Sequence, residues 1–172
     1  FKLEALKLTE LLNKKVLEMP DVFGINQTAI SKKTQELLDT ANSMYHDHKG
    51  DIHLLDLGET SCLALGKALN EKKIDYVLAI DERTTRMLCE KPDNLKKLLQ
   101  KKLHTSIKYD KSKAKIFQGF KIIRSVELIY IAHKKGLTKL KGKQALDALL
   151  FALKFKGCSV SHEEIEQIEK LG

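Results

Sequence analysis

The sequence contains no tryptophan, only two prolines and three cysteines, and it has no long apolar run. Its longest strongly apolar stretch, 148–153, is far too short to span a bilayer, so we expect no membrane association. The scarcity of proline together with 42% hydrophobic residues excludes a disordered or collagen-like chain. Cys62, Cys89 and Cys158 are odd in number and widely spaced, which excludes a disulfide framework and zinc-ligand spacing. With no visible signal peptide, we expect a soluble, cytoplasmic protein.

Arginine is also scarce, because 28 of the 31 basic residues are lysines. The formal charge of +8 predicts a polyanionic partner, although a lysine bias by itself reflects genome composition or growth temperature as readily as binding. Lysines crowd the stretch 91–115, which favours either a surface that follows a phosphate backbone or a merely solubilising one. With 6% aromatic residues, platforms for base stacking are few, so sequence-specific binding of single strands is disfavoured.

Hydrophobic periodicity predicts strands alternating with helices in one domain that spans 1–172, with the Lys-rich stretch 91–115 as an insertion. This alternation favours an α/β fold, a three-layer α/β/α sandwich with a mostly parallel sheet. The predicted strands are 52–57, 75–81 and 116–124. The predicted helices are 3–17, 28–46, 59–72, one that begins near 82 and is interrupted at Pro92, 94–102, 125–136, 143–156 and one that a capping box opens at Ser161.

Acidic residues follow two of the predicted strands. Asp56 and Glu59 come after the first, and Asp81 and Glu82 come after the second. In a parallel sheet these ends meet at one crevice, where crowded carboxylates favour a divalent ion such as Mg²⁺ or Mn²⁺. Glu59 and Glu82 are equally explained by the preference for acids in the first turn of a helix. Asp81 ends a wholly apolar run and is the stronger metal-ligand candidate.

These residues carry a resemblance to a known family. Asp56-Leu57-Gly58-Glu59 with the helix that follows (GETSCLALGKAL), and then a hydrophobic strand ending in Asp81-Glu82-Arg83, resemble the PIN-domain superfamily. The similarity is to the VapC-like prokaryotic ribonuclease branch that carries a Gly-Glu third-acid motif. It covers roughly residues 51–90 and 116–165 and implies a PIN-like fold.

The resemblance implies a Mg²⁺- or Mn²⁺-dependent ribonuclease with three or four acids at its centre. Glu59 and Asp81 match the third and fourth acids, Glu82 is an accessory metal ligand, and Glu36 is the candidate for the second acid. The first acid, an Asp that closes an N-terminal strand, has no match, so we expect it either upstream of Phe1 or absent from the protein.

Arg83 and Arg86 follow the last acids directly, and two interpretations stay open for them. They either contact an RNA phosphate, for which the planar guanidinium is well suited, or are solvated helix residues.

Three hypotheses follow for function. The first is a metal-dependent endoribonuclease that cleaves RNA phosphodiester bonds, a toxin that pairs with an antitoxin protein and forms a homodimer, as the resemblance implies. The second is a non-catalytic PIN-like RNA-binding or assembly module with an incomplete acidic site. The third, an α/β phosphotransfer or receiver-like domain, lacks a suitably placed lysine and hydroxyl residue after its later strands.

Overall fold

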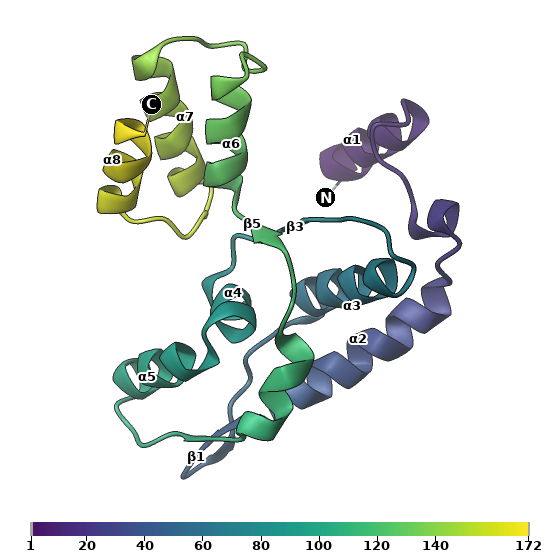
Figure 1. Cartoon of the computed structure of the whole chain (residues 1–172), viewed down its shortest axis with the longest axis vertical. Helices are drawn as coiled ribbons and strands as arrows, with labels where there is room; N and C mark the ends of the chain where they lie inside the picture. The colour runs from purple at the N-terminus through teal and green to yellow at the C-terminus, as the bar shows by residue number, and fades with distance from the viewer. Residues whose placement is uncertain (1, 172) are drawn as a thin grey trace.

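The computed structural model describes residues 2–171, which form two helical units joined by a short pair of strands, with one further helix standing apart (Figure 1). The helices are α1 (Lys2–Asn13), α2 (Gln27–Asn42), α3 (Leu57–Glu71), α4 (Arg83–Glu90), α5 (Pro92–Leu103), α6 (Ser125–Lys134), α7 (Lys143–Phe155) and α8 (His162–Lys170), with 3-10 helices η1 (Pro20–Phe23) and η2 (Lys111–Phe117). The strands are β1 (Tyr45–Asp47), β2 (Gly50–Asp51), β3 (Leu78–Ala79), β4 (Lys108–Tyr109) and β5 (Ile122–Ile123).

The first unit is built on the pair α2 and α3, with α4, α5 and η2 around it. Its core includes Leu37 and Ala41 from α2 and Leu63 from α3, all fully buried. Helix α3 packs closely against the strand segment that follows it, and Gly66 leaves room for this, since an added Cβ there would approach the Tyr76 ring to 3.0 Å.

The second unit contains α6, α7 and α8 and has a separate core. Val126, Leu146, Leu150 and Ile165 are its most buried side chains. The capping box predicted at Ser161 is confirmed, because its hydroxyl accepts from the Glu164 N–H while that carboxylate accepts from the Ser161 N–H. The two units are linked where β3 pairs with β5 in parallel.

The predicted three-layer α/β/α sandwich with a mostly parallel sheet is wrong. The described residues are mainly helical, and parallel pairing is limited to the two-residue ladder between β3 and β5. The other sheet, in the order β2-β1-β4, is antiparallel and equally short.

A side chain explains why the first predicted strand, 52–57, does not form. The Asn42 amide oxygen accepts from the backbone N–H of Leu54 and Leu55, and its NH₂ group donates to the Leu55 carbonyl. These backbone groups are therefore satisfied by a side chain rather than by a neighbouring strand. The apolar residues of the segment still pack against the core, which explains the strand-like pattern.

Most predicted helices are confirmed, with shifted ends. The helix predicted over 28–46 ends at Asn42, and residues 45–47 form β1, whose Tyr45 is buried and stacks on Tyr109 with ring centroids 4.7 Å apart. The helix predicted over 94–102 is α5, which begins earlier because Pro92 takes a first-turn position. In the part of the chain that the structure describes, no helix combines the length and the apolar character needed to cross a membrane.

Candidate functional site

Asp81, the strongest metal-ligand candidate from the sequence, is hydrogen-bonded to the second unit. One carboxylate oxygen accepts from the backbone N–H of Ser125 at 2.8 Å, and the other accepts from the Ser125 hydroxyl at 2.6 Å. The Cys158 thiol also donates to this carboxylate, at 3.2 Å. Because β3 and β5 run in parallel, the end of one strand lies beside the end of the other, where α6 begins. Asp81 thus lies at the positive end of α6 and joins the two units.

These contacts determine the charge of the group. Burial alone would raise the pKa of Asp81, but the hydrogen bonds from Ser125 and Cys158, with the positive charge of Arg86 nearby, lower it below the usual value. Burial and the bond to Asp81 raise the pKa of the Cys158 thiol to about 11. The carboxylate is therefore ionised and the thiol protonated near neutral pH, as the hydrogen bond between them requires.

Glu82 faces the first unit and caps α4. Its carboxylate accepts from the backbone N–H of Thr84 and Thr85 at 2.7 and 2.5 Å, and from the Thr85 hydroxyl at 2.8 Å. Burial would raise the pKa of Glu82, but these bonds lower it below the usual value. The sequence left two interpretations open for Glu82, a metal ligand or a helix cap. In the structure its side chain acts as a helix cap.

Glu59 lies on the first turn of α3 and shares a small pocket with Glu82. The pocket has a volume of about 130 Å³, and Asp56 and Thr85 also line it. Asp56 is further bonded to His53, from Nε2 at 2.8 Å. The structure thus brings together Asp56, Glu59 and Glu82 and leaves Asp81 outside this pocket.

The remaining predicted site residues lie elsewhere. Glu36, on α2, is exposed and lines another pocket, with Lys67 and Tyr76. Arg83 is exposed on the first turn of α4. Arg86 lines a polar pocket of about 180 Å³ between the two units, where its buried Nη1 has no hydrogen-bond partner among the described residues.

Sequence reasoning did not single out Arg124, which organises the other side of this inter-unit pocket. Its guanidinium donates to Glu127 on α6 and to Glu164 on α8, and only 14% of its side chain is exposed. The backbone N–H of Arg124 also donates to the Glu127 carboxylate, so Glu127 is the side chain that caps the first turn of α6.

The acidic side chains at this site are of the type that binds a divalent ion, but their oxygens are not arranged around a common point. Oxygen ligands suit Mg²⁺ and Mn²⁺, and three acids line one pocket. As they lie, however, the oxygens of Glu82 are directed to its own helix, and those of Asp81 to Ser125 and Cys158. Among residues 2–171, no group of three His, Cys, Asp or Glu side chains is placed to hold a metal ion.

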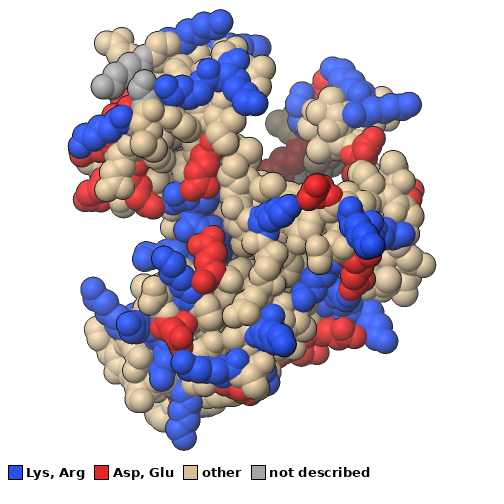
Figure 2. Space-filling model, viewed as in Figure 1, with Lys and Arg blue, Asp and Glu red and all other residues tan. Residues whose placement is uncertain are grey.

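The positive charge of the chain is concentrated in one segment, residues 91–115, which we call the basic segment. It holds nine lysines and two aspartates, so it carries seven of the eight net positive charges. The segment folds as α5, β4 and η2 at one corner of the first unit, where lysine and arginine side chains gather on the surface with few acids among them (Figure 2). The lysines that lie close together in the sequence therefore also lie close together on the surface of the folded unit.

Few of these lysines are neutralised by neighbouring acids. Lys111 pairs with Asp93 at 3.0 Å, and Lys113 donates to the carbonyl and hydroxyl of Ser43. Six others are exposed and form no ion pair with any described residue: Lys91, Lys97, Lys101, Lys102, Lys108 and Lys115. Unpaired, solvated ammonium groups of this kind can exchange counterions for the phosphates of a polyanion.

Comparison with known proteins adds no family to this description: no protein-family model, curated protein or solved structure matches the chain.

Proposed function

We propose that this chain is a non-catalytic RNA-binding module that contacts the phosphate backbone through the basic segment. The observation that carries the proposal is the localisation of seven of the eight net positive charges in residues 91–115, on one corner of the folded unit. The choice of RNA among polyanions comes only from the sequence motifs in residues 51–90 and 116–165 that resemble the PIN-domain superfamily, since the sandwich fold implied by that resemblance is not the fold of this chain.

The aromatic side chains of this corner favour binding that does not depend on sequence. Tyr109 is half-buried, one face of its ring stacks on Tyr45, and the ammonium of Lys111 lies 6.0 Å from its centroid. The ring is therefore already used within the protein, and the sequence has no tryptophan to replace it. Lysines that meet phosphates without a stacking platform give backbone contacts with little base discrimination.

The test is the salt dependence of RNA binding, measured by fluorescence anisotropy with a labelled RNA hairpin. Each phosphate contact adds about 0.7–0.9 to the slope of log affinity against log salt. A variant with three lysines of the basic segment neutralised should bind more weakly and lose about 2 from that slope. The substitutions are Lys101→Gln, Lys102→Gln and Lys108→Gln.

The control removes the same charge from three exposed lysines outside the basic segment. Its substitutions are Lys139→Gln, Lys141→Gln and Lys156→Gln. We expect this variant to keep most of the slope of the parent chain. Equal losses in the two variants would show that only net charge matters, and the absence of RNA binding by the parent chain would refute the proposal outright.

A second candidate function is the metal-dependent endoribonuclease that the resemblance implies. One observation favours it: Asp56, Glu59 and Glu82 line the same pocket. Calorimetric titration with Mn²⁺ tests it, with Glu59→Gln and Glu82→Gln as variants and Asp75→Asn, whose side chain is 98% exposed and does not line this pocket, as the control. Binding that the first two weaken and the control does not would support this candidate and justify an RNA cleavage assay. No Mn²⁺ binding by the folded parent chain would leave the RNA-binding module.

A further inference from the structure

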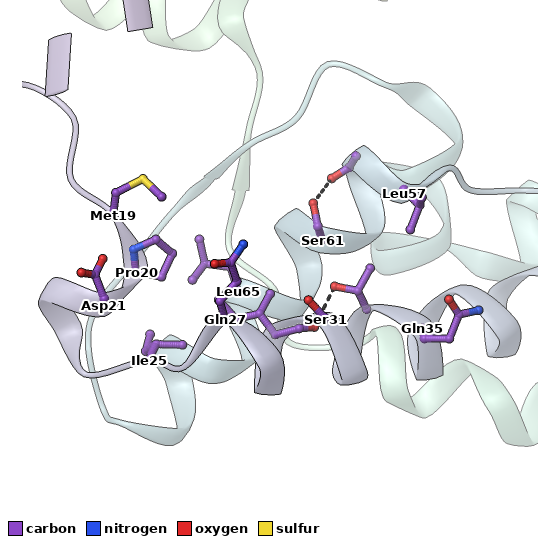
Figure 3. Close-up of a pocket in the computed structure, with 13 residues that line it drawn as sticks. Met19, Pro20, Asp21, Ile25, Gln27, Ser31, Gln35, Leu57, Ser61 and Leu65 are labelled. Carbon is purple, nitrogen blue, oxygen red and sulfur yellow. Dashed lines mark hydrogen bonds between the residues drawn. The ribbon is translucent and has the colours of Figure 1, made fainter. Parts of the chain in front are cut away.

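Helices α2 and α3 border two separate cavities, which differ in the groups that line them. The first, of about 930 Å³, lies between these helices and η1, and its described lining contains one charged residue, Asp21 (Figure 3). Two hydroxyls on its walls are bonded within their own helices, since Thr34 donates to the Ile30 carbonyl and Ser61 to the Gly58 carbonyl. This cavity therefore gives a ligand little electrostatic orientation.

The second cavity contains charges of both signs. Its volume of about 410 Å³ lies within the range of about 300–1,000 Å³ for small-molecule sites. Lys33 and Glu71 form an ion pair between α2 and α3 and neutralise each other. Lys67 on α3 and Glu36 on α2 also line the cavity, and neither has an ion-pair partner among the described residues. One cation and one anion are thus left for a ligand.

The surroundings of Lys67 favour an added negative charge. Its ammonium lies 5.5 Å from the centroid of the Phe120 ring, which lines the same cavity. Burial lowers the pKa of Lys67, and the positive charge of Lys33 lowers it further, while the negative charge of Glu71 opposes this only in part. A carboxylate beside the ammonium would replace the water that burial removes and would offset the charge of Lys33.

Aromatic and amide side chains form other parts of the wall. Tyr76 and Phe120 are half-buried and pack against the core of the first unit, so their rings present an apolar surface that is held in place. Asn70 and Gln118 add amide groups, which can donate to a carboxylate or accept from an ammonium. The cavity therefore combines two opposite charges, polar groups that suit both, and an apolar wall.

We propose that this cavity binds an α-amino acid with an aromatic or large apolar side chain. Lys67 contacts the carboxylate of the ligand and Glu36 its ammonium, while the rings of Tyr76 and Phe120 contact its side chain. A zwitterion matches both unpaired charges, whereas a simple anion would meet the like charge of Glu36. The residues that line the cavity lie outside the basic segment, so the inference does not depend on the proposed function.

Ligand-observed NMR with each of the standard amino acids at about 10 mM tests the proposal. We expect phenylalanine, tyrosine and leucine to bind, and glycine to bind more weakly because it has no side chain to meet the apolar wall. Two analogues of phenylalanine separate the charges: phenethylamine lacks the carboxylate, and 3-phenylpropionate lacks the ammonium. Each should bind about tenfold more weakly than phenylalanine. No binding by any amino acid, or equal binding of phenylalanine and either analogue, would overturn the proposal.

Two variants assign the charges to their residues. Lys67→Met should weaken the binding of phenylalanine and of 3-phenylpropionate about tenfold and leave that of phenethylamine unchanged. Glu36→Gln should weaken phenylalanine and phenethylamine instead, and because Glu36 is exposed this variant should fold even if Lys67→Met does not. The matched control is Lys32→Met, which removes an exposed lysine of α2 outside the cavity and should bind phenylalanine as the parent chain does. Folded variants that weaken all three ligands equally, or not at all, would refute the assignment.

Discussion

Replacing Asp81 by asparagine tests whether this acid stabilises the contact between the two units or serves as a metal ligand. The carboxylate accepts two hydrogen bonds from Ser125 and one from Cys158. Hydrogen bonds to a charged group contribute roughly 1.5–3 kcal/mol each, and asparagine keeps one acceptor while turning its NH₂ group toward a donor. We expect Asp81→Asn to lower the free energy of unfolding by about 2–3 kcal/mol, which corresponds to a fall of about 5–10 °C in Tm.

The stabilisation by Asp81 should depend on pH in a defined direction. The pKa of Asp81 is lowered in the folded state, so its stabilisation is fully present above the ordinary value of 3.8 and is lost as the pH falls through the folded value. The difference in Tm between the parent chain and Asp81→Asn should therefore be large near neutral pH and shrink in acid. Thermal unfolding in a chelating buffer, followed by circular dichroism, measures both quantities.

The matched control is Asp75→Asn, which removes a carboxylate whose side chain is 98% exposed and pairs with Lys121. It should change Tm little, because exposed ion pairs contribute little. If Asp81→Asn were as stable as the parent chain or more stable without metal, the structural role would be refuted. Unchanged or increased stability is the result expected for a metal ligand in the absence of metal, because removing one of several neighbouring acids relieves the repulsion between them.

Three further substitutions test the packing and the caps, each measured by denaturant unfolding. Leu150→Ala should cost about 2–4 kcal/mol, because the side chain is fully buried in the second core. Gly66→Ala should cost about 1 kcal/mol, because the new Cβ meets the Tyr76 and Leu78 side chains at 3.0 and 3.1 Å and this overpacking outweighs the helix propensity that alanine adds to α3. Glu82→Ala should cost about 1 kcal/mol through the lost cap of α4. The folded-state pKa of Glu82 is lowered below the usual 4.5, so this effect should be fully present above 4.5 and lost as the pH falls through the lowered folded pKa.

Helices were predictable from this sequence because their signals are local. Ser161 and Glu164 form a capping box wherever the rest of the chain lies, and Pro92 favours a first turn in any context. Strands were predictable only in part, because a strand needs a partner that the sequence does not specify. The predicted strands 75–81 and 116–124 contain β3 and β5, but each is only two residues long. The run from Ile52 to Leu57 has the apolar pattern of a buried strand, yet Asn42, a dozen residues earlier, satisfies its backbone.

The candidate site was predictable in part for the same reason. Glu59 and Asp81 were expected at one crevice, with Glu82 as an accessory ligand. Glu59 and Glu82 do line one pocket, because each lies at the start of a helix of the first unit, but Asp81 lies outside it. Glu36 was assigned through the resemblance with no local motif, and it lies in another pocket.

The placement of Asp81 follows from the topological rule that made it a metal-ligand candidate. Parallel pairing brings the ends of two strands to one edge, and that edge was expected to receive a ligand. The same edge also receives the first turn of the helix that follows the neighbouring strand, with its unpaired N–H groups and positive dipole. Because Ser125 begins α6 only two residues after β5, its N–H and hydroxyl lie within hydrogen-bond distance of Asp81. They satisfy the carboxylate without a bound ligand. In this chain the strand-terminal Asp81 is therefore accounted for by its hydrogen bonds to the start of α6.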